Sequence, residues 1–337
     1  MSAGVRLSVA IPLHNEEAGV AELLRRLGAV LDAIPGGPHE IMLVDDGSTD
    51  RTLQVVSDAA HLDSRVVVVA LSRNFGHQAA LSAALDFVSG DVVVAMDGDL
   101  QDRPEAIPAL LAKHHEGYDV VYAQRAKRKE RWPLRLSYFL FYRLLASLAD
   151  TRLPLDSGDF ALMSRRVVEQ MRAAREHHRY LRGLRSWVGF RQTGVVVERD
   201  GRFAGSTHYG SLKLLKLASD GLFSFSIVPL RAAALLGVLA IVLSGAFSLY
   251  TLYAKLVLDR APAGFTSIML FLSFLSGVHL FFLGVIGEYI GRIYEETKRR
   301  PLYVVGSVMR GGTVVSSDPP RLPVPPYATP STRHTTA

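Results

Sequence analysis

The chain has no cysteine among its 337 residues. This absence excludes disulfide bonds, thiolate metal sites and thiol nucleophiles, so any chemistry must come from other side chains. Two phosphate-binding signatures are also missing after the first apolar run, because neither G-x-x-x-x-G-K nor G-x-G-x-x-G follows it. Residues 1–6 do not have the shape of a signal peptide, and we therefore expect the first domain to stay in the cytoplasm.

Positive charge is in modest excess, with a formal net charge of +6. The basic residues concentrate at 125–131 and 298–300, and the second cluster adjoins an apolar segment. This placement favours an anionic lipid surface over a nucleic-acid duplex. We therefore expect membrane lipids, and no nucleic acid, among the partners.

Residues 6–123 alternate short β-branched runs with amphipathic stretches, which predicts βαβ units and a mostly parallel sheet. The predicted strands cover residues 7–11, 41–44, 66–71, 92–96 and 120–123, and the predicted helices cover 18–31, 50–60, 78–87 and 104–115. Ligands of such sheets bind beyond the carboxyl ends of the strands. All five strands end in polar residues, which predicts a site there: His14-Asn15-Glu16, Asp45-Asp46, Arg73-Asn74, Asp97-Gly98-Asp99 and Gln124-Arg125.

Two later segments, 232–254 and 265–287, each run 23 residues without a charge. At ~1.5 Å per residue, each helix would be ~34 Å long, enough to cross a hydrocarbon core of ~30 Å. The short connection predicts a hairpin, and the basic residues beyond both outer ends place those ends in the cytoplasm. Segments 132–150 and 211–226 are apolar with interspersed charge, which fits interfacial helices. For 132–150, an ordinary core helix is an equal alternative.

These segments predict four parts of the chain. They are a cytoplasmic catalytic domain with interfacial helices at 1–226, a transmembrane hairpin at 227–290, a cytoplasmic segment at 291–310 and a disordered, proline-rich tail at 311–337. The strand-like run at 302–308 is a candidate for pairing with a neighbouring subunit.

Asp97 and Asp99 stand one residue apart at a predicted strand end, where both carboxylates can bind one hard cation such as Mg²⁺ or Mn²⁺. Asp45 and Asp46 suit a nucleotide's ribose or base. The same stretch also fits a helix N-cap, with Ser48 or Asp50 as the cap, and both interpretations can hold together. Arg125 and Arg128 are candidates for phosphate contacts.

Several motifs, in order, resemble family 2 glycosyltransferases, and more narrowly the polyprenyl-phosphate glycosyltransferases of the dolichol-phosphate mannosyltransferase and bactoprenol glucosyltransferase type. They are Val9–Glu17, Val44–Asp50, Leu71–Gly76, Met96–Gln101, Asp156–Phe160 and Gly284–Tyr303. The resemblance covers roughly residues 6–305. It implies a GT-A (nucleotide-diphospho-sugar transferase) α/β fold of Rossmann-like type.

The resemblance also implies roles for individual residues. Nucleotide contacts fall on Pro12, His14, Glu16, Asp45 and Asp46, and Gly98 belongs to the same binding site. Metal contacts fall on Asp97, Asp99 and Gln101, and phosphate contacts on Arg125, Arg202 and His208. His208 stands where the family usually has lysine, so its charge depends on pH. The catalytic carboxylate falls on Asp159, with Asp156 as the second choice. A capped turn is the structural alternative for this pair.

The resulting hypothesis is an inverting hexosyltransferase at the cytoplasmic face of the plasma membrane, with Mg²⁺ or Mn²⁺ as cofactor. The donor would be a nucleotide-sugar, UDP-glucose first, and the acceptor an undecaprenyl-type phosphate, for cell-envelope glycosylation. A homo-oligomer and a flippase are further candidate partners. The alternatives are a GDP-mannose-dependent mannosyltransferase, a processive polysaccharide synthase, and a non-catalytic scaffold with a degenerate transferase domain. Two spans and the lack of a Q-x-x-R-W run disfavour the synthase.

Overall fold

The computed structural model describes residues 5–125, 157–177, 179–197, 228–257 and 264–316. The chain forms two compact units. The first comprises Met1–Ala146, Thr151–Gly210 and Pro301–Ala337, and the second comprises Ser147–Asp150 and Ser211–Arg300. The residues of the first unit therefore include a segment that follows the second unit in sequence.

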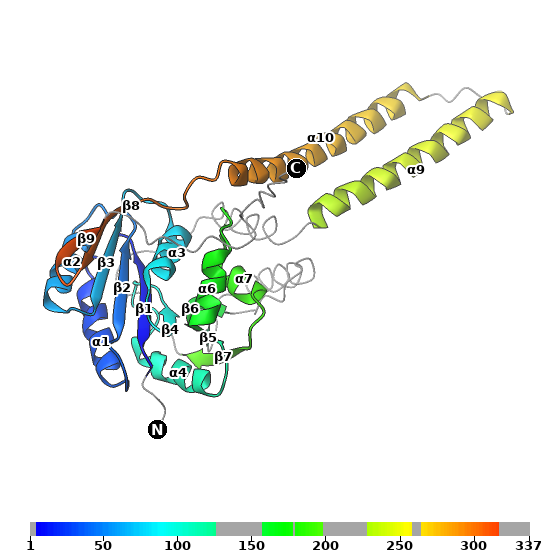
Figure 1. The fold of residues 1–337 in the computed structure, drawn as a ribbon. Helices are drawn as coiled ribbons and strands as arrows, with labels where there is room; N and C mark the ends of the chain where they lie inside the picture. The colour runs from blue at the N-terminus through cyan, green and yellow to red at the C-terminus, as the bar shows by residue number, and fades with distance from the viewer. Residues whose placement is uncertain (1–4, 126–156, 178, 198–227, 258–263, 317–337) are drawn as a thin grey trace, which may run out of the picture. The chain divides into compact units, whose positions relative to one another are not determined.

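The first unit contains a mixed sheet of nine described strands, in the order β7-β5-β6-β4-β1-β2-β3-β8-β9 (Figure 1). The strands are β1 Leu7–Leu13, β2 Glu40–Asp45, β3 Val66–Leu71, β4 Val92–Ala95, β5 Val120–Arg125, β6 Ser157–Ser164, β7 Gln192–Val197, β8 Val305–Arg310 and β9 Thr313–Ser316. β4, β1, β2 and β3 are mutually parallel. The five predicted strands are confirmed, with small differences at their ends.

Helices cover both faces of this sheet. One face packs against α1 Val20–Asp32, α2 Thr52–Leu62 and α4 Ile107–His115, the last preceded by a 3₁₀ turn at Pro104–Ala106. The other packs against α3 His77–Phe87, α6 Arg165–Ala173 and α7 Leu181–Trp187. Strand alternation explains the two faces, because Leu7, Val9 and Ile11 join the first core while Ala10 joins the second. All four predicted helices are confirmed.

The strand order reverses at β1, which lies between β2 and β4. The chain runs β1 to β2 to β3 in one direction and then returns to place β4 on the other side of β1. A crevice for a ligand is expected beyond the carboxyl ends of the strands at such a point. Asp97 follows β4 at that position.

Strand β6 was not among the predicted strands, and it is antiparallel to both β4 and β5. It occupies the place beside β4 that a wholly parallel sheet would give to β5. The local sequence around Asp159 also fits a turn, so only the pairing with β4 and β5 reveals the strand.

The run at 302–308 does not need a neighbouring subunit for pairing, because β8 pairs antiparallel with β3 of its own chain. β9 pairs in turn with β8, so the sheet extends past residue 311, where the tail was predicted to begin. Val305 and Val308, which lie on either side of a register shift in the pairing with β3, both bury their side chains against the sheet core, and this burial gives β8 a physical reason to dock there.

The second unit contains two long helices, α9 Val228–Leu256 and α10 Phe265–Thr297, which contact each other. Within the described residues, one segment is long and apolar enough to cross a membrane by length and composition, at 274–297 in α10. α9 holds a shorter apolar stretch at Leu235–Phe247. The two helices of the predicted hairpin are present, while two full spans are not established. The predicted interfacial helices lie outside the described residues.

Candidate active site

Asp97 and Asp159 meet because of the register between β4 and β6. Val92 pairs with Ser164 and Ala95 with Ala161, so the same register continued by two residues sets Asp97 opposite Asp159. Since β6 is antiparallel, its beginning lies at the edge where the parallel strand β4 ends. Carboxylates 62 positions apart in sequence, counted as 159 minus 97, therefore share one edge of the sheet.

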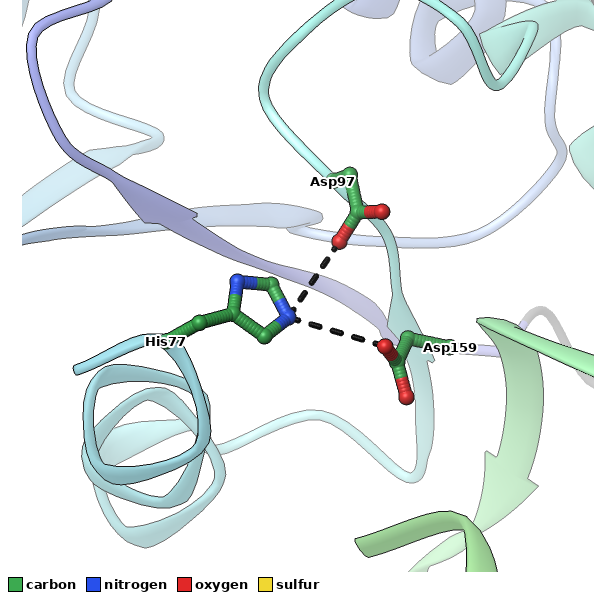
Figure 2. Close-up of side chains that lie close together, drawn as sticks. All are labelled: His77, Asp97 and Asp159. Atoms are coloured by element: carbon green, nitrogen blue, oxygen red, sulfur yellow. Dashed lines mark ion pairs between the residues drawn. The ribbon is translucent and has the colours of Figure 1, made fainter. Parts of the chain in front are cut away.

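His77 points at both carboxylates (Figure 2). Its Nε2 lies 3.5 Å from Asp97 Oδ1 and 3.6 Å from Asp159 Oδ2. His77 is the first residue of α3 and follows Gly76, whose φ of 98° is readily adopted by glycine. Partial desolvation disfavours the imidazolium, but Asp159 and Asp97 outweigh that effect and raise the pKa of His77 above its ordinary value.

Asp159 is buried and held by Arg182 of α7 through two parallel hydrogen bonds. Arg182 Nε donates to Oδ1 at 2.8 Å and Nη2 donates to Oδ2 at 2.7 Å. Burial alone would favour the neutral acid, yet Arg182 and His77 together hold the pKa of Asp159 far below its usual range. Asp159 is therefore a fixed anion at neutral pH and a weak proton acceptor.

A second arginine of α7, Arg185, lies behind this pair and is only 2% exposed. Its two terminal nitrogens donate long 3.4 Å hydrogen bonds to the Gly158 carbonyl, and its guanidinium lies 5.6 Å from the Tyr122 ring centroid. Burial lowers the pKa of Arg185 to about 10. It remains cationic at neutral pH, so α7 adds two positive charges beside Asp159.

Gly98 lets the loop after β4 pass close to β1. A Cβ placed on Gly98 would overlap the Leu13 side chain and lie 3.3 Å from the Pro12 carbonyl oxygen. A larger residue here requires the Leu13 side chain to move and crowds the Pro12 carbonyl of β1. The small residue between Asp97 and Asp99 is thus a requirement of packing at the point where the strand order reverses.

The two aspartates at the end of β2, Asp45 within the strand and Asp46 just after it, have different surroundings. Asp46 accepts hydrogen bonds from the backbone amides of Phe75 at 2.7 Å and Gly76 at 2.9 Å, although burial still raises its pKa. Asp45 is 2% exposed, and its Oδ2 accepts a hydrogen bond from the Ser48 amide. Its Oδ1 is buried without a hydrogen-bond partner. Asp46 therefore positions the loop before His77, whereas the role of Asp45 as a nucleotide contact stays a prediction.

The loop after β1 lies against the same region. His14 Nδ1 is 3.0 Å from the Asp46 carbonyl oxygen, and Asn74 Nδ2 lies 3.2 Å from the His14 ring nitrogens. Pro12 lies within β1, paired with Val44. The Glu16 amide donates to Thr52 Oγ1, which ties this loop to the start of α2.

Asp99 and Gln101 form a turn after Asp97. Asp99 Oδ1 accepts a hydrogen bond from the Gln101 amide at 3.1 Å, and Leu100 between them has a φ of 59°. The buried Leu100 side chain anchors this turn in the core. Neither Asp99 nor Gln101 belongs to the cluster that brings Asp97 together with His77 and Asp159. Their assignment as metal ligands stays a prediction.

Several predicted site residues lie outside the described residues: Arg128, Asp156, Arg202 and His208. The backbone of Arg125 ends β5, and its side chain is not described. Three residues that the structure places at the site were not predicted from the sequence: His77, Arg182 and Arg185. His77 follows the Leu71–Gly76 motif directly, which was the one available signal. The α7 arginines carried none, because only the fold brings α7 to Asp159.

One group of described residues has ligand atoms spaced to hold a metal ion. These are single atoms of His77, Asp97 and Asp159, all within 4.8 Å of one another. Carboxylate oxygens with an imidazole nitrogen suit a divalent cation. The residues present therefore fit the metal that the sequence motif implies.

Most of the chain is similar to known glycosyltransferases. The family described as Glycosyl transferase family 2 matches residues 8–172. The chain is 44% identical to the uncharacterized glycosyltransferase YkcC of Bacillus subtilis, over 90% of this chain and 94% of that protein. It is 36% identical to an SfII prophage-derived bactoprenol glucosyl transferase of Shigella flexneri, over 91% and 99% of the two chains. The crystal structure of mannosyl-3-phosphoglycerate synthase from Rubrobacter xylanophilus is similar at a TM-score of 0.45 and 21% identity, over 64% and 71%.

This chain belongs to glycosyl transferase family 2. It is a glycosyltransferase with a GT-A-like α/β fold and a mixed sheet, and relatives named bactoprenol glucosyl transferase match most of its length.

Proposed function

We propose that this glycosyltransferase moves a hexose, glucose first, from a nucleotide-sugar onto a polyprenyl phosphate with inversion at the anomeric carbon. The observation that carries the proposal is the state of Asp159, an ionised carboxylate fixed by Arg182 through two hydrogen bonds. The bactoprenol glucosyl transferases among the relatives support the same acceptor class.

The acceptor class follows from proton chemistry. A sugar hydroxyl must lose its proton as it attacks, which requires a general base near the acceptor. Asp159 is poorly suited to that task because Arg182 and His77 lower its pKa so far. A phosphate monoester is already anionic at neutral pH and needs no base. Asp159 then acts by orienting the reacting groups and by electrostatic complementarity to positive charge at the anomeric carbon.

The donor would bind along the edge where β1, β2 and β4 end. Asp45 Oδ1 offers a buried acceptor to the ribose or base, and Pro12, His14 and Glu16 belong to the adjoining loop. A divalent cation, Mg²⁺ or Mn²⁺, would be held by Asp97 with Asp99 and Gln101 nearby, and when bound it neutralises the leaving diphosphate. Arg125, Arg128, Arg202 and His208 remain the predicted phosphate contacts.

The sheet constrains any membrane crossing. The chain leaves the first unit before α9 and returns to it as β8, which pairs with β3. One folded sheet lies on one side of a membrane, so the segment between must cross an even number of times. If α10 crosses once, a second crossing is needed, and α9 is the other long helix among the described residues, despite its shorter apolar stretch. We therefore propose a two-helix hairpin at 227–290, with the sheet in the cytoplasm and 291–310 on the same side.

Large exposed apolar side chains on both helices support this anchor. They include Leu235, Phe247, Phe271, Phe274 and Phe281, each about half exposed or more. The candidate span in α10 has none of its apolar window buried, unlike the core helix of a soluble protein. Burial in lipid would remove this surface from water.

The test is a transfer assay with purified protein in detergent, labelled UDP-glucose, GDP-mannose or UDP-N-acetylglucosamine, and Mg²⁺ or Mn²⁺. Undecaprenyl phosphate and the free alcohol undecaprenol serve as matched acceptors. We expect transfer from UDP-glucose to the phosphate and none to the alcohol. Asp159→Asn should lower kcat at least about 100-fold, while Asp58→Asn, on the exposed face of α2, should not. Equal transfer to the alcohol would contradict the proposed role of Asp159.

A further inference from the structure

We propose that His77 binds the divalent cation directly through Nε2, alongside Asp97, and that this nitrogen ligand makes the site prefer Mn²⁺ to Mg²⁺. The inference rests on the metal-dependent function proposed above and assigns a ligand outside the Asp97–Gln101 motif. His77 comes from α3, so the ligand set joins two elements that are separate in sequence.

The distances are those of ion pairs and are compatible with a shared ion. Nε2 lies 3.5 Å from Asp97 Oδ1 and 3.6 Å from Asp159 Oδ2, both longer than an N–H···O bond of 2.7–3.2 Å. Ligand atoms at about 2.1–2.2 Å from one ion lie roughly 3.0 Å apart when adjacent and about 4.3 Å apart when opposite. The observed spacings fall inside that range. One ligand atom of each of the three side chains lies within 4.8 Å of the others, and the side chains converge on one point (Figure 2).

Asp159 is the weaker partner of this group. Each of its oxygens already accepts a hydrogen bond from Arg182, so its charge is shared with a fixed cation. Asp97 and His77 therefore provide the direct ligands, and Asp159 lies beside the ion. Such a site leaves positions for phosphate oxygens.

His77 is held in place independently of any ion. Asp46 accepts hydrogen bonds from the Phe75 and Gly76 amides, the two residues before it. These hydrogen bonds fix the backbone that leads into His77, and its ring extends from the start of α3 toward Asp97 (Figure 2). The imidazole is thus presented by a built loop rather than by a flexible surface segment.

The choice of metal follows from ligand chemistry. Mg²⁺ is a hard cation that takes oxygen ligands and keeps its waters, so an imidazole adds little to its binding. Mn²⁺, a transition-metal ion, accepts nitrogen as well as oxygen ligands more readily. The nitrogen of His77 should therefore strengthen Mn²⁺ binding more than Mg²⁺ binding.

The experiment uses full-length protein in detergent with UDP and Mn²⁺, observed by electron paramagnetic resonance without any transfer reaction. Electron spin echo modulation from a directly bonded ¹⁴N nucleus reports a histidine ligand. We expect this modulation in the wild type and its loss in His77→Gln, with Mn²⁺ affinity at least about tenfold weaker. Mg²⁺ affinity, measured by competition, should change less than threefold. His115→Gln, which removes an exposed histidine on α4, should retain the signal.

Two failures would be distinguishable. If the wild type binds Mn²⁺ through Asp97, as shown by loss of binding in Asp97→Asn, but gives no ¹⁴N modulation, the assignment of His77 is wrong and the metal-dependent function stands. If Asp97→Asn binds Mn²⁺ as tightly as the wild type, the metal site itself is wrong. Equal losses of Mn²⁺ and Mg²⁺ affinity in His77→Gln would overturn the preference for Mn²⁺.

Discussion

At the scale of single residues, Arg182 and Asp159 form a pair of opposite charges joined by two hydrogen bonds, with His77 beside it. Arg182→Gln removes the fork of two donors and leaves a buried carboxylate with a weaker partner. We expect kcat to fall at least about 100-fold, with KM for the donor changed much less, because the loss affects the reacting centre. Arg182→Lys should recover only part of the lost kcat, since lysine cannot donate two parallel hydrogen bonds to the carboxylate.

Steady-state kinetics at saturating metal would measure the changes in kcat and in KM for the donor separately. Arg25→Gln is the matched control, because Arg25 forms a similar two-bond pair with Glu22 but is 69% exposed. Exposed pairs of this kind contribute little to stability, because water screens them. A normal kcat in Arg182→Gln would mean that Asp159 needs no fixed orientation.

A glycine tests the packing at the strand-order reversal. Gly98→Ala places a methyl group against the Leu13 side chain and the Pro12 carbonyl, so the buried Leu13 side chain must move and the loop that carries Asp97 is crowded against β1. We expect a loss of about 1–3 kcal/mol of stability and a larger loss of Mn²⁺ binding. Gly28→Ala is the control, because its nearest contact is 3.7 Å away and alanine favours the helix. Thermal unfolding and a metal titration measure the two effects; unchanged metal affinity in Gly98→Ala would contradict the close approach.

At the scale of elements, β8 is tied to the core by a side chain as well as by its backbone pairing. Tyr303, just before β8, donates a 2.7 Å hydrogen bond to Asp86 Oδ2 of α3, and Asp86 Oδ1 is buried with no hydrogen-bond partner. Burial raises the pKa of Asp86, while the Tyr303 hydroxyl opposes that rise. Tyr303→Phe should therefore destabilise the protein by about 1–3 kcal/mol at pH 8.

The sign of the pH dependence follows from linkage. An acid whose pKa is higher in the folded state costs stability above that pKa, and the cost disappears below its unfolded value of about 3.9. Tyr303→Phe raises the folded pKa of Asp86 further. The difference in melting temperature from the wild type should thus be largest at pH 8 and shrink toward pH 4. Tyr294→Phe, on an exposed ring of α10, should show neither effect. A difference that grew toward pH 4 would contradict the role assigned to Asp86.

At the scale of the whole molecule, the return of the chain to its own sheet decides the topology. Because the sequence has no cysteine, single introduced cysteines can report sidedness without background. We expect Ala261→Cys, between α9 and α10, to react with a membrane-impermeant thiol reagent in intact cells. Ser64→Cys and Arg300→Cys should react only after permeabilisation, because β3 and β8 share one sheet.

Labelling of Arg300→Cys from outside would contradict the pairing of β8 with β3 in the membrane-bound protein. Protection of all three positions would mean that α9 and α10 lie on the membrane without crossing it. Both labelling patterns differ from the pattern expected for the hairpin, and mass spectrometry of the labelled chain distinguishes them.

The parallel half of the fold was predictable because its signals are local. The valine-rich runs at 66–71 and 92–96 are too apolar for a surface position, and buried strands need such runs. The amphipathic spacing of Val20, Leu23 and Leu27 likewise specifies a helix with one buried side. Asp97 was found because a polar residue after a buried strand must lie at the sheet edge. Its placement needs no information from distant segments.

The rest depended on contacts between residues far apart in sequence. Local sequence cannot specify that β6 enters antiparallel beside β4, yet that register is what sets Asp159 against Asp97. Arg182 lies 23 residues after Asp159 in sequence. It reaches Asp159 because α7 packs on the face of the sheet that α3 and α6 also cover. Likewise β8 pairs with β3 across more than 230 residues, a separation given by 305 minus 71. The sequence by itself determined the first five strands, the helices between them, the apolar helices and the acidic motif, because these arise from local periodicity. The tertiary structure decided which charges surround Asp159, because burial and pairing alone bring those segments together.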